Sequence, residues 1–332
     1  MDTKSINSKK KILVILGPTA TGKTDLGLKI AEVFKGEIIS ADSRQVYKNL
    51  DIGTNKFPGK YSVIHKHDGF WVIDDIPIWG YDVVDPNTQY SVFDFLKYSL
   101  SKIDEILKKD KLPIVVGGTG LYIRALTEGL SNLEVSYNLE RRKELENLTL
   151  EEVQKILIDI SPSKFESLNN SEKNNKRRLV RHIEIETSKK EKPEGYGFIK
   201  VLSGDCDILK IGITASREFL KKRVNKKVVS WIEDGIIDEA KSSISRGISV
   251  ERLRELGLEY RIVADYIDGV IKTKEDLIDT LQIKNNQYVK RQLTWFKKES
   301  HVVWFDITNP NHKKDIEKTV RVWYHKSNDQ KG

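Results

Sequence analysis

Short apolar runs alternate with segments of helical character in the first part of the chain. Residues 11–16, 37–40 and 112–116 are short and rich in apolar, β-branched side chains, which is typical of buried parallel strands. Apolar positions recur at helical spacing over 24–34, and we expect the basic segment 93–109 to be helical as well. This alternation of strand and helix predicts a parallel sheet that is covered by helices.

The pattern changes near residue 131. Residues 131–200 are mostly helix formers with many charges and contain no convincing strand. The apolar run 209–214 then predicts a strand that returns to the first sheet. After it we expect helices over 216–246, 251–268 and 274–298, a strand over 302–306 and a polar C-terminal helix. The expected fold is an α/β core, residues 1–130 and 201–332, interrupted by an all-helical insertion domain, residues 131–200.

The composition narrows the class of protein. The 332 residues can bury a sizeable core, and 38% hydrophobic and 32% charged residues are ordinary for a soluble protein. No run of eighteen apolar residues is present, which argues against a membrane span, and the first residues lack the apolar region of a signal peptide. A single cysteine, Cys206, excludes an internal disulfide or a cysteine zinc site. We therefore expect a cytoplasmic protein, with a monomer as the default.

One segment has the full pattern of a phosphate-binding loop, G-x-x-x-x-G-K-[ST]. It lies between a predicted strand and a predicted helix, and it consists of Gly17, Pro18, Thr19, Ala20, Thr21, Gly22, Lys23 and Thr24. Glycines let successive backbone amides point at one anion, and the helix that follows adds the positive end of its dipole. Lys23 supplies a cation, and the Thr24 hydroxyl can bind Mg²⁺. The segment predicts a P-loop NTPase-like core that binds a phosphate chain, but it does not identify a reaction.

Two further loops follow predicted strands, and the carboxyl ends of parallel strands face the ligand crevice. Asp42 comes after the strand at 37–40, where its carboxylate could hold magnesium or accept a proton, although a helix cap explains it equally well. Residues 117–120 (GGTG) allow a close approach of backbone to a ligand, although a tight turn is the simpler explanation. No acidic residue ends the strand 112–116, which argues against an ordinary ATPase.

Basic residues indicate a polyanionic partner, which the net charge of +8 alone does not establish. Arg223 lies among four lysines and could stabilise a departing diphosphate, although a solvated helix face is the commoner explanation. Residues 173–190 hold seven Lys or Arg, and residues 284–298 hold five, with Tyr288 and Trp295 interleaved. Basic groups neutralise phosphates and aromatic rings stack on unpaired bases. Either stretch alone fits an amphipathic helix, but both together beside a phosphate-binding core favour nucleic acid.

Taken together, these segments resemble the tRNA dimethylallyltransferases, which isopentenylate the adenosine next to the anticodon. The motifs are 17–24 (GPTATGKT), 40–47 (SADSRQVY), 51–54 (DIGT), 90–95 (YSVFDF), 117–122 (GGTGLY), 177–184 (RRLVRHIE) and 290–296 (KRQLTWF). They occur in family order across nearly the whole chain, and their conjunction is highly specific. The resemblance implies transfer of a dimethylallyl group from dimethylallyl diphosphate to N6 of adenosine 37 in tRNAs that read codons beginning with U.

The resemblance also implies a role for each motif. The loop 17–24 would hold the diphosphate with Mg²⁺ at Thr24, and Thr19 would contact the oxygen that bridges the prenyl carbon to the diphosphate. Asp42 would take a proton from the adenine amine, and Arg223 would steady the leaving diphosphate. The insertion domain would cover the anticodon stem-loop. The residues expected to contact tRNA are Asp42, Ser43, Arg44, Gln45, Thr119, Arg177, Arg178, Leu179, Val180, Arg181, Gln287, Lys290, Arg291, Gln292 and Trp295.

Some positions depart from the family pattern, and two other functions stay open. Trp79–Tyr81 stand where the family has a histidine pair, Arg44 where it has a small residue, and Lys227 where it has a second arginine. An adenylate isopentenyltransferase, which prenylates free AMP, ADP or ATP, shares the core motifs but has less need of the basic stretches. A non-catalytic P-loop nucleotide- or RNA-binding protein would use those stretches only for docking.

Overall fold

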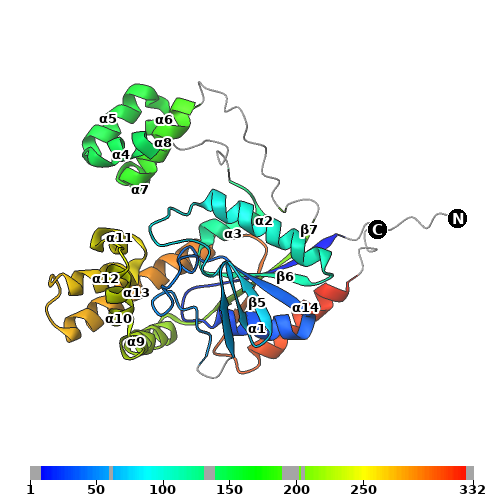
Figure 1. Ribbon diagram of the computed structural model, residues 1–332. Coiled ribbons are helices and arrows are strands. Elements are labelled where there is room, and N and C mark those ends of the chain that lie inside the picture. Colours follow the sequence, from blue (N-terminus) through cyan, green and yellow to red (C-terminus); the bar gives the residue numbers. More distant parts are fainter. Residues whose placement is uncertain (1–8, 60–62, 131–138, 189–201, 203–205, 327–332) are drawn as a thin grey trace. The chain divides into compact units, whose positions relative to one another are not determined.

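Figure 1 shows the computed structural model of the chain, which describes residues 9–59, 63–130, 139–188, 202 and 206–326. The chain divides into two compact units. The first, here called the core unit, comprises residues 1–129 and 201–332, and the second, here called the insertion unit, comprises residues 130–200. Within the described ranges, no helix is long and apolar enough to cross a membrane.

The core unit is built on an eight-stranded sheet with the strand order β3-β4-β5-β2-β6-β1-β7-β8. Its strands are β1 (Lys10–Leu16), β2 (Gly36–Ser40), β3 (Ile64–His67), β4 (Phe70–Ile73), β5 (Ile76–Trp79), β6 (Leu112–Gly117), β7 (Cys206–Thr214) and β8 (Val302–Asp306). The strands from β5 to β8 in that order pair in parallel, and Ile15 of β1 is in register with Val116 of β6 and Ile211 of β7. The predicted parallel sheet is confirmed, including the return of residues 209–214 to it.

Helices cover both faces of this sheet (Figure 1). On one face, α1 (Lys23–Phe34) and α14 (His312–His325) share an apolar cluster with alternate strand residues such as Ile15. On the other face, α2 (Val92–Lys108) packs on β2 and β6, and α3 (Gly120–Thr127) packs on β1. Successive strand side chains point to opposite faces, and here both faces are covered. That is why the central strands read as continuous apolar runs.

A second apolar cluster lies among the helices that follow β7. These helices are α9 (Arg217–Glu233), α10 (Ile236–Ser245), α11 (Val250–Glu255), α12 (Leu258–Ile267) and α13 (Lys274–Phe296). The expectation of single helices over 216–246 and 251–268 is wrong, because each segment forms two. Gly235 adopts a φ of +95°, a left-handed conformation that interrupts the first segment between α9 and α10. Gly257 separates α11 from α12 in the second.

The described part of the insertion unit is entirely helical, as predicted. Its helices are α4 (Leu139–Asn147), α5 (Leu150–Ile160), α6 (Pro162–Ser167), α7 (Asn170–Lys173) and α8 (Lys176–Ser188). They enclose a small apolar core of their own, in which Val153 and Leu157 of α5 meet Leu179 and Ile183 of α8. The last two residues of the basic stretch 173–190, Lys189 and Lys190, lie outside the described residues.

The apolar pattern does not predict the three short strands β3, β4 and β5. Each has only four residues, too few to establish a period of two, and β3 exposes His65, Lys66 and His67. β3 and β4 form an antiparallel hairpin added to one edge of the parallel sheet through β5. The hairpin is held by Trp71, which is fully buried and packs edge-on against Tyr81.

Candidate active site

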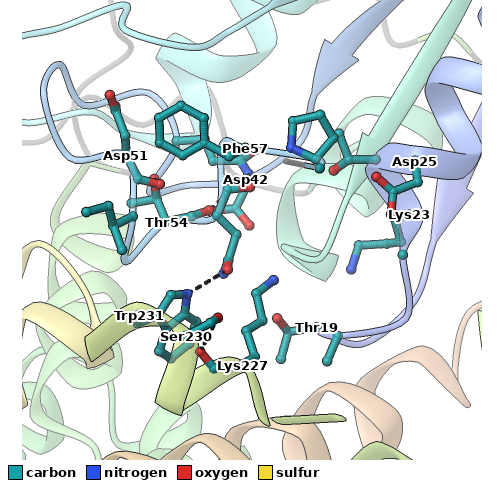
Figure 2. A pocket seen from close by; sticks show the side chains of 18 of the residues that line it. Thr19, Lys23, Asp25, Asp42, Asp51, Thr54, Phe57, Lys227, Ser230 and Trp231 are labelled. Carbon is teal, nitrogen blue, oxygen red and sulfur yellow. Dashed lines mark hydrogen bonds between the residues drawn. The ribbon is translucent and has the colours of Figure 1, made fainter. Parts of the chain in front are cut away.

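A pocket of about 1100 Å³ opens at the carboxyl ends of β1, β2 and β6 (Figure 2). Its walls come from the loop 17–24, from residues between 42 and 59, from the strand end 116–118 and from one face of α9. The parallel sheet brings these segments together, because its strands all end at the same edge. Among the residues singled out from the sequence, the pocket collects Thr19, Lys23, Thr24, Asp42, Gln45 and Arg223.

The loop 17–24 makes a tight turn that depends on its glycines. Gly17 has a φ of +150°, and a Cβ added there would lie only 2.3 Å from the carbonyl oxygen of Ile213 in β7. Within the loop, the Thr21 hydroxyl and the Lys23 ammonium both donate to the Pro18 carbonyl at 2.8 Å. These bonds hold the loop folded over the start of α1, where the helix dipole favours an anion.

Four cationic side chains line the pocket, and two of them, Lys23 and Lys227, are partly buried. Figure 2 shows the side chains of Lys23 and Lys227 pointing into it, and Arg223 and Lys226 also line it. Burial lowers the pKa of Lys23 to about 8, even though the charge of Asp42 acts in the opposite direction. Burial likewise lowers the pKa of Lys227 to about 8. The nearby carboxylates offset only part of this loss of hydration, so an incoming anion would favour the charged form of both lysines.

Asp42 lines the pocket and is not a helix cap. It follows β2, and its carboxylate accepts the backbone N–H of Arg44 at 2.9 Å within a turn. The backbone N–H of Ser43 donates to the Thr119 hydroxyl at 3.1 Å, which ties this turn to the loop after β6. The carboxylate is thus held by its own turn at the pocket wall, and the loop 117–120 supports that turn.

The glycines at 117–120 serve contacts between protein segments. A Cβ added to Gly117 would lie 2.2 Å from the carbonyl oxygen of Ala41, and one added to Gly120 would lie 2.2 Å from the Trp295 ring. A Cβ added to Gly118 would lie 2.9 Å from Nε2 of the Gln292 side chain. The close approach that the sequence suggests is therefore real, but the described contacts are with other parts of the chain.

A buried ion cluster supports the pocket wall formed by residues 51–58. The ammonium of Lys56, which is 0% exposed, lies 2.8 Å from Asp51 and 2.5 Å from Asp82. Lys66 from β3 binds the second oxygen of Asp51 at 2.6 Å, and the Trp71 indole N–H donates to Asp82 at 2.6 Å. The antiparallel hairpin thereby completes the cluster, which pairs two cations with two carboxylates.

Glu239 of α10, which lies 188 residues after Asp51 in the chain, also holds this wall in place. Its carboxylate accepts the backbone N–H groups of Asp51 at 2.7 Å and Ile52 at 3.0 Å. The Tyr260 hydroxyl makes a short hydrogen bond to Glu239 and accepts the N–H of Gly53 at 3.1 Å. Sequence reasoning missed Lys56, Asp82 and Glu239. The motif 51–54 was the available signal, but it does not reveal partners almost 190 residues away.

A second carboxyl group near Asp42 was also missed. Burial raises the pKa of Glu259 in α12 to about 7, and the negative charge of Asp42 acts in the same direction. Burial and the Asp42 charge also raise the pKa of Tyr288 in α13 above its ordinary value. The charge of Asp42 therefore acts on groups that α12 and α13 contribute.

The residues of α13 that were expected to contact tRNA divide into two sets. Gln287, Lys290 and Arg291 are exposed, as a nucleic-acid surface requires. Gln292 is buried, and the Trp295 ring packs on Gly120 with the Arg124 guanidinium 4.8 Å from the ring centre.

The expected tRNA contacts on α8 lie in the insertion unit. Arg177 and Arg178 are exposed, whereas Leu179 and Val180 are buried in the core of that unit. Arg181 makes an ion pair with Glu184 at 3.0 Å. The side chains of this segment that are free to meet a polyanion on the surface are therefore those of the first two arginines.

Comparison with known proteins places these features in one family. The model of the IPP transferase family matches residues 45–299. The chain is 37% identical to tRNA dimethylallyltransferase 2 of Treponema denticola over 298 residues, which covers 90% of this chain and 95% of that protein. It is 34% identical to the tRNA dimethylallyltransferase of Halalkalibacterium halodurans over 314 residues, which covers 93% and 95%.

Solved structures show the same likeness. The full-length tRNA isopentenylpyrophosphate transferase of Bacillus halodurans matches with a TM-score of 0.65 and 32% identity, and the match covers 95% of this chain and 97% of that one. The tRNA isopentenylpyrophosphate transferase of Staphylococcus epidermidis matches with a TM-score of 0.64 and 30% identity, covering 94% and 99%. A eukaryotic dimethylallyltransferase acting on tRNA shares the fold, with a TM-score of 0.73 at 23% identity.

Proposed function

The chain belongs to the IPP transferase family, and on that premise we propose that it transfers a dimethylallyl group from dimethylallyl diphosphate to N6 of the adenosine beside the anticodon of tRNA. The residues that line the pocket are the main support for this proposal. The pocket is lined by residues of the loop 17–24 after β1, by Arg223 and Lys227, and by the carboxylate of Asp42 after β2, the strand separated from β1 by β6. A leaving diphosphate and a proton acceptor are the two requirements of this reaction.

The pocket residues divide the chemistry between them. The exocyclic amine of adenine is a weak nucleophile, because its lone pair is delocalised into the ring. As the new N–C bond forms and the prenyl C–O bond breaks, Asp42 takes the proton from the amine. The diphosphate leaves with the bridging oxygen, and its charge is met by the loop amides, Lys23 and Arg223. Thr19 at the pocket wall is placed to contact that oxygen.

The residues around Thr24 fit a magnesium ion. Thr24 and Asp25 line the same pocket, while the described residues form no cluster of three or more His, Cys, Asp or Glu. Mg²⁺ takes few protein ligands and completes its shell with phosphate oxygens and water, so such a sparse donor set is what it requires. When bound, Mg²⁺ would neutralise charge on the diphosphate.

Nucleic-acid binding is proposed for two surfaces. One is the exposed side of α13, with Gln287, Lys290 and Arg291, and the other is the start of α8, with Arg177 and Arg178. Their guanidinium and ammonium groups can neutralise the phosphates of an anticodon stem-loop. The target adenine must leave its stack to reach a pocket below the surface, as in other base-modifying enzymes. A monomeric, cytoplasmic protein is part of the same proposal.

Asp42→Asn provides the test. Wild-type protein is incubated with labelled dimethylallyl diphosphate, Mg²⁺ and unmodified tRNA, and the nucleosides are then analysed for prenylated adenosine. The variant should lose about 10²- to 10⁴-fold in rate, because the amide cannot accept the proton, while stem-loop affinity stays close to wild type. Faster prenylation of free AMP than of tRNA would favour an adenylate isopentenyltransferase. An active Asp42→Asn variant would remove the case for this carboxylate as the base.

A further inference from the structure

The side chain of Gln292, one of the residues expected to contact tRNA, makes two hydrogen bonds inside the protein. It lies on α13 and is 7% exposed. Its Oε1 accepts the backbone N–H of Thr19 at 2.9 Å, and its Nε2 donates to the backbone carbonyl of Gly118 at 3.0 Å. The two partners also determine which end of the amide is oxygen, because an N–H group must meet an acceptor and a carbonyl must meet a donor.

Both partners of Gln292 belong to the anion-binding side of the pocket. Thr19 and Gly118 line the pocket, and a Cβ added to Gly118 would lie 2.9 Å from Gln292 Nε2 and 3.6 Å from Lys23 Nζ. The next residue, Thr119, accepts the N–H of Ser43 in the turn that holds Asp42. One buried side chain therefore connects the phosphate loop to the loop after β6, and through it to the loop of the proposed base.

Helical periodicity explains how one helix can have two roles. Gln292 faces the pocket loops, as its bonds to Thr19 and Gly118 show, and Tyr288, one turn before it, is partly buried. Gln287, Lys290 and Arg291 are exposed. The inner face of α13 is thus bound to the pocket loops, and its outer face is the part that remains available to nucleic acid.

We propose that Gln292 is a positioning residue for the diphosphate loop and does not contact tRNA. This inference rests on the proposed function, and it replaces the expectation from the sequence for this residue. By holding the Thr19 N–H, Gln292 keeps the Thr19 hydroxyl at the pocket wall and the phosphate loop in register with Gly118. Its loss would leave a partly buried N–H and a buried carbonyl without these partners, and the phosphate loop would move to satisfy them.

Two glutamines on one helix provide a matched experiment. Gln292→Met keeps the length of the side chain and removes both hydrogen bonds. Gln292→Glu keeps the acceptor for the Thr19 N–H but loses the donor to the Gly118 carbonyl. Gln287→Met is the matched control, because it removes an exposed amide on the same helix. Each variant is titrated with inorganic diphosphate and Mg²⁺ by calorimetry without RNA, and separately with an anticodon stem-loop RNA. Michaelis constants for dimethylallyl diphosphate and tRNA are measured in parallel, and thermal unfolding shows which variants are folded.

Gln292→Met should weaken diphosphate binding about tenfold or more and change stem-loop affinity less than about twofold. Gln292→Glu should weaken diphosphate binding further, because it adds negative charge beside the anion. Gln292→Asn, a neutral and shorter amide that cannot reach both partners, should weaken it as well, and it decides the question if the methionine variant does not fold. Gln287→Met should show the opposite pattern. The proposal is overturned if the Gln292 variants lose stem-loop affinity and keep that for diphosphate. Diphosphate binding needs no prenyl transfer, so an inactive wild type would count against the proposed function alone.

Discussion

Replacement of Lys56 by methionine tests whether the buried ion cluster holds the pocket wall in place. The ammonium group has no solvent exposure and contacts Asp51 at 2.8 Å, Asp82 at 2.5 Å and the Tyr47 carbonyl at 2.7 Å. Methionine fills most of the same space without the charge, so the perturbation is mainly electrostatic. After the change, Lys66 alone would balance two buried carboxylates.

The size of the effect follows from this imbalance. Removal of one partner from a buried ion pair costs about 3–5 kcal/mol, because the remaining charge is left uncompensated. For a unit of about 260 residues, that corresponds to a fall in melting temperature of roughly 5–9 °C. The Trp71 N–H still donates to Asp82, and Lys66 still pairs with Asp51, so we do not expect a larger loss.

The double variant Lys56→Met/Asp82→Asn separates charge balance from packing. It removes one positive and one negative charge, leaves the Lys66–Asp51 pair at 2.6 Å, and leaves an amide oxygen for the Trp71 N–H. Urea unfolding should show the double variant recovering about 1–3 kcal/mol relative to the single variant. If the double variant is as unstable as the single variant, or less stable, the ionic explanation of the cluster is refuted and packing is the cause.

Three further outcomes are expected from the same structure. Burial lowers the pKa values of Lys23 and Lys227 in the free protein to about 8, so each loses its positive charge above that pH. The Michaelis constant for dimethylallyl diphosphate should then rise with pH by up to about tenfold per pH unit for each lysine. The variant Lys227→Arg stays protonated and should make this rise shallower. A Michaelis constant that does not change with pH would contradict the prediction. Gly120→Ala would push a methyl group into the Trp295 ring and should lower the free energy of unfolding, measured in urea, by about 1–3 kcal/mol. Addition of Trp295→Leu should restore part of that stability. An unchanged unfolding midpoint for Gly120→Ala would mean that the ring moves freely. Tyr260→Phe removes the hydroxyl that binds Glu239 and should cost about 1–3 kcal/mol, and stability equal to wild type would show that Glu239 holds the loop unaided.

Local patterns were sufficient for the central sheet and its phosphate loop. β1, β2 and β6 are buried on both faces over most of their length, so their sequences contain continuous apolar runs, and the loop 17–24 carries its glycines, lysine and threonine within eight residues. The helix breaks at Gly235 and Gly257 were not predicted, because a single glycine inside a helical pattern is often tolerated. The hairpin β3–β4 was not predicted, because strands of four residues are too short to show a period of two.

The fold class, the phosphate loop and the position of Asp42 after a strand could be predicted from the sequence, because each depends on residues that are neighbours in the chain. The side chains that hold those segments in place come from distant parts of the sequence, and they were identified only in the folded structure. Lys56 meets Asp82, Glu239 meets the backbone of Asp51, and Gln292 meets Thr19 across more than 270 residues. A single polar side chain has many possible partners, and which one it meets is decided when the sheet and its helices pack together and bury it.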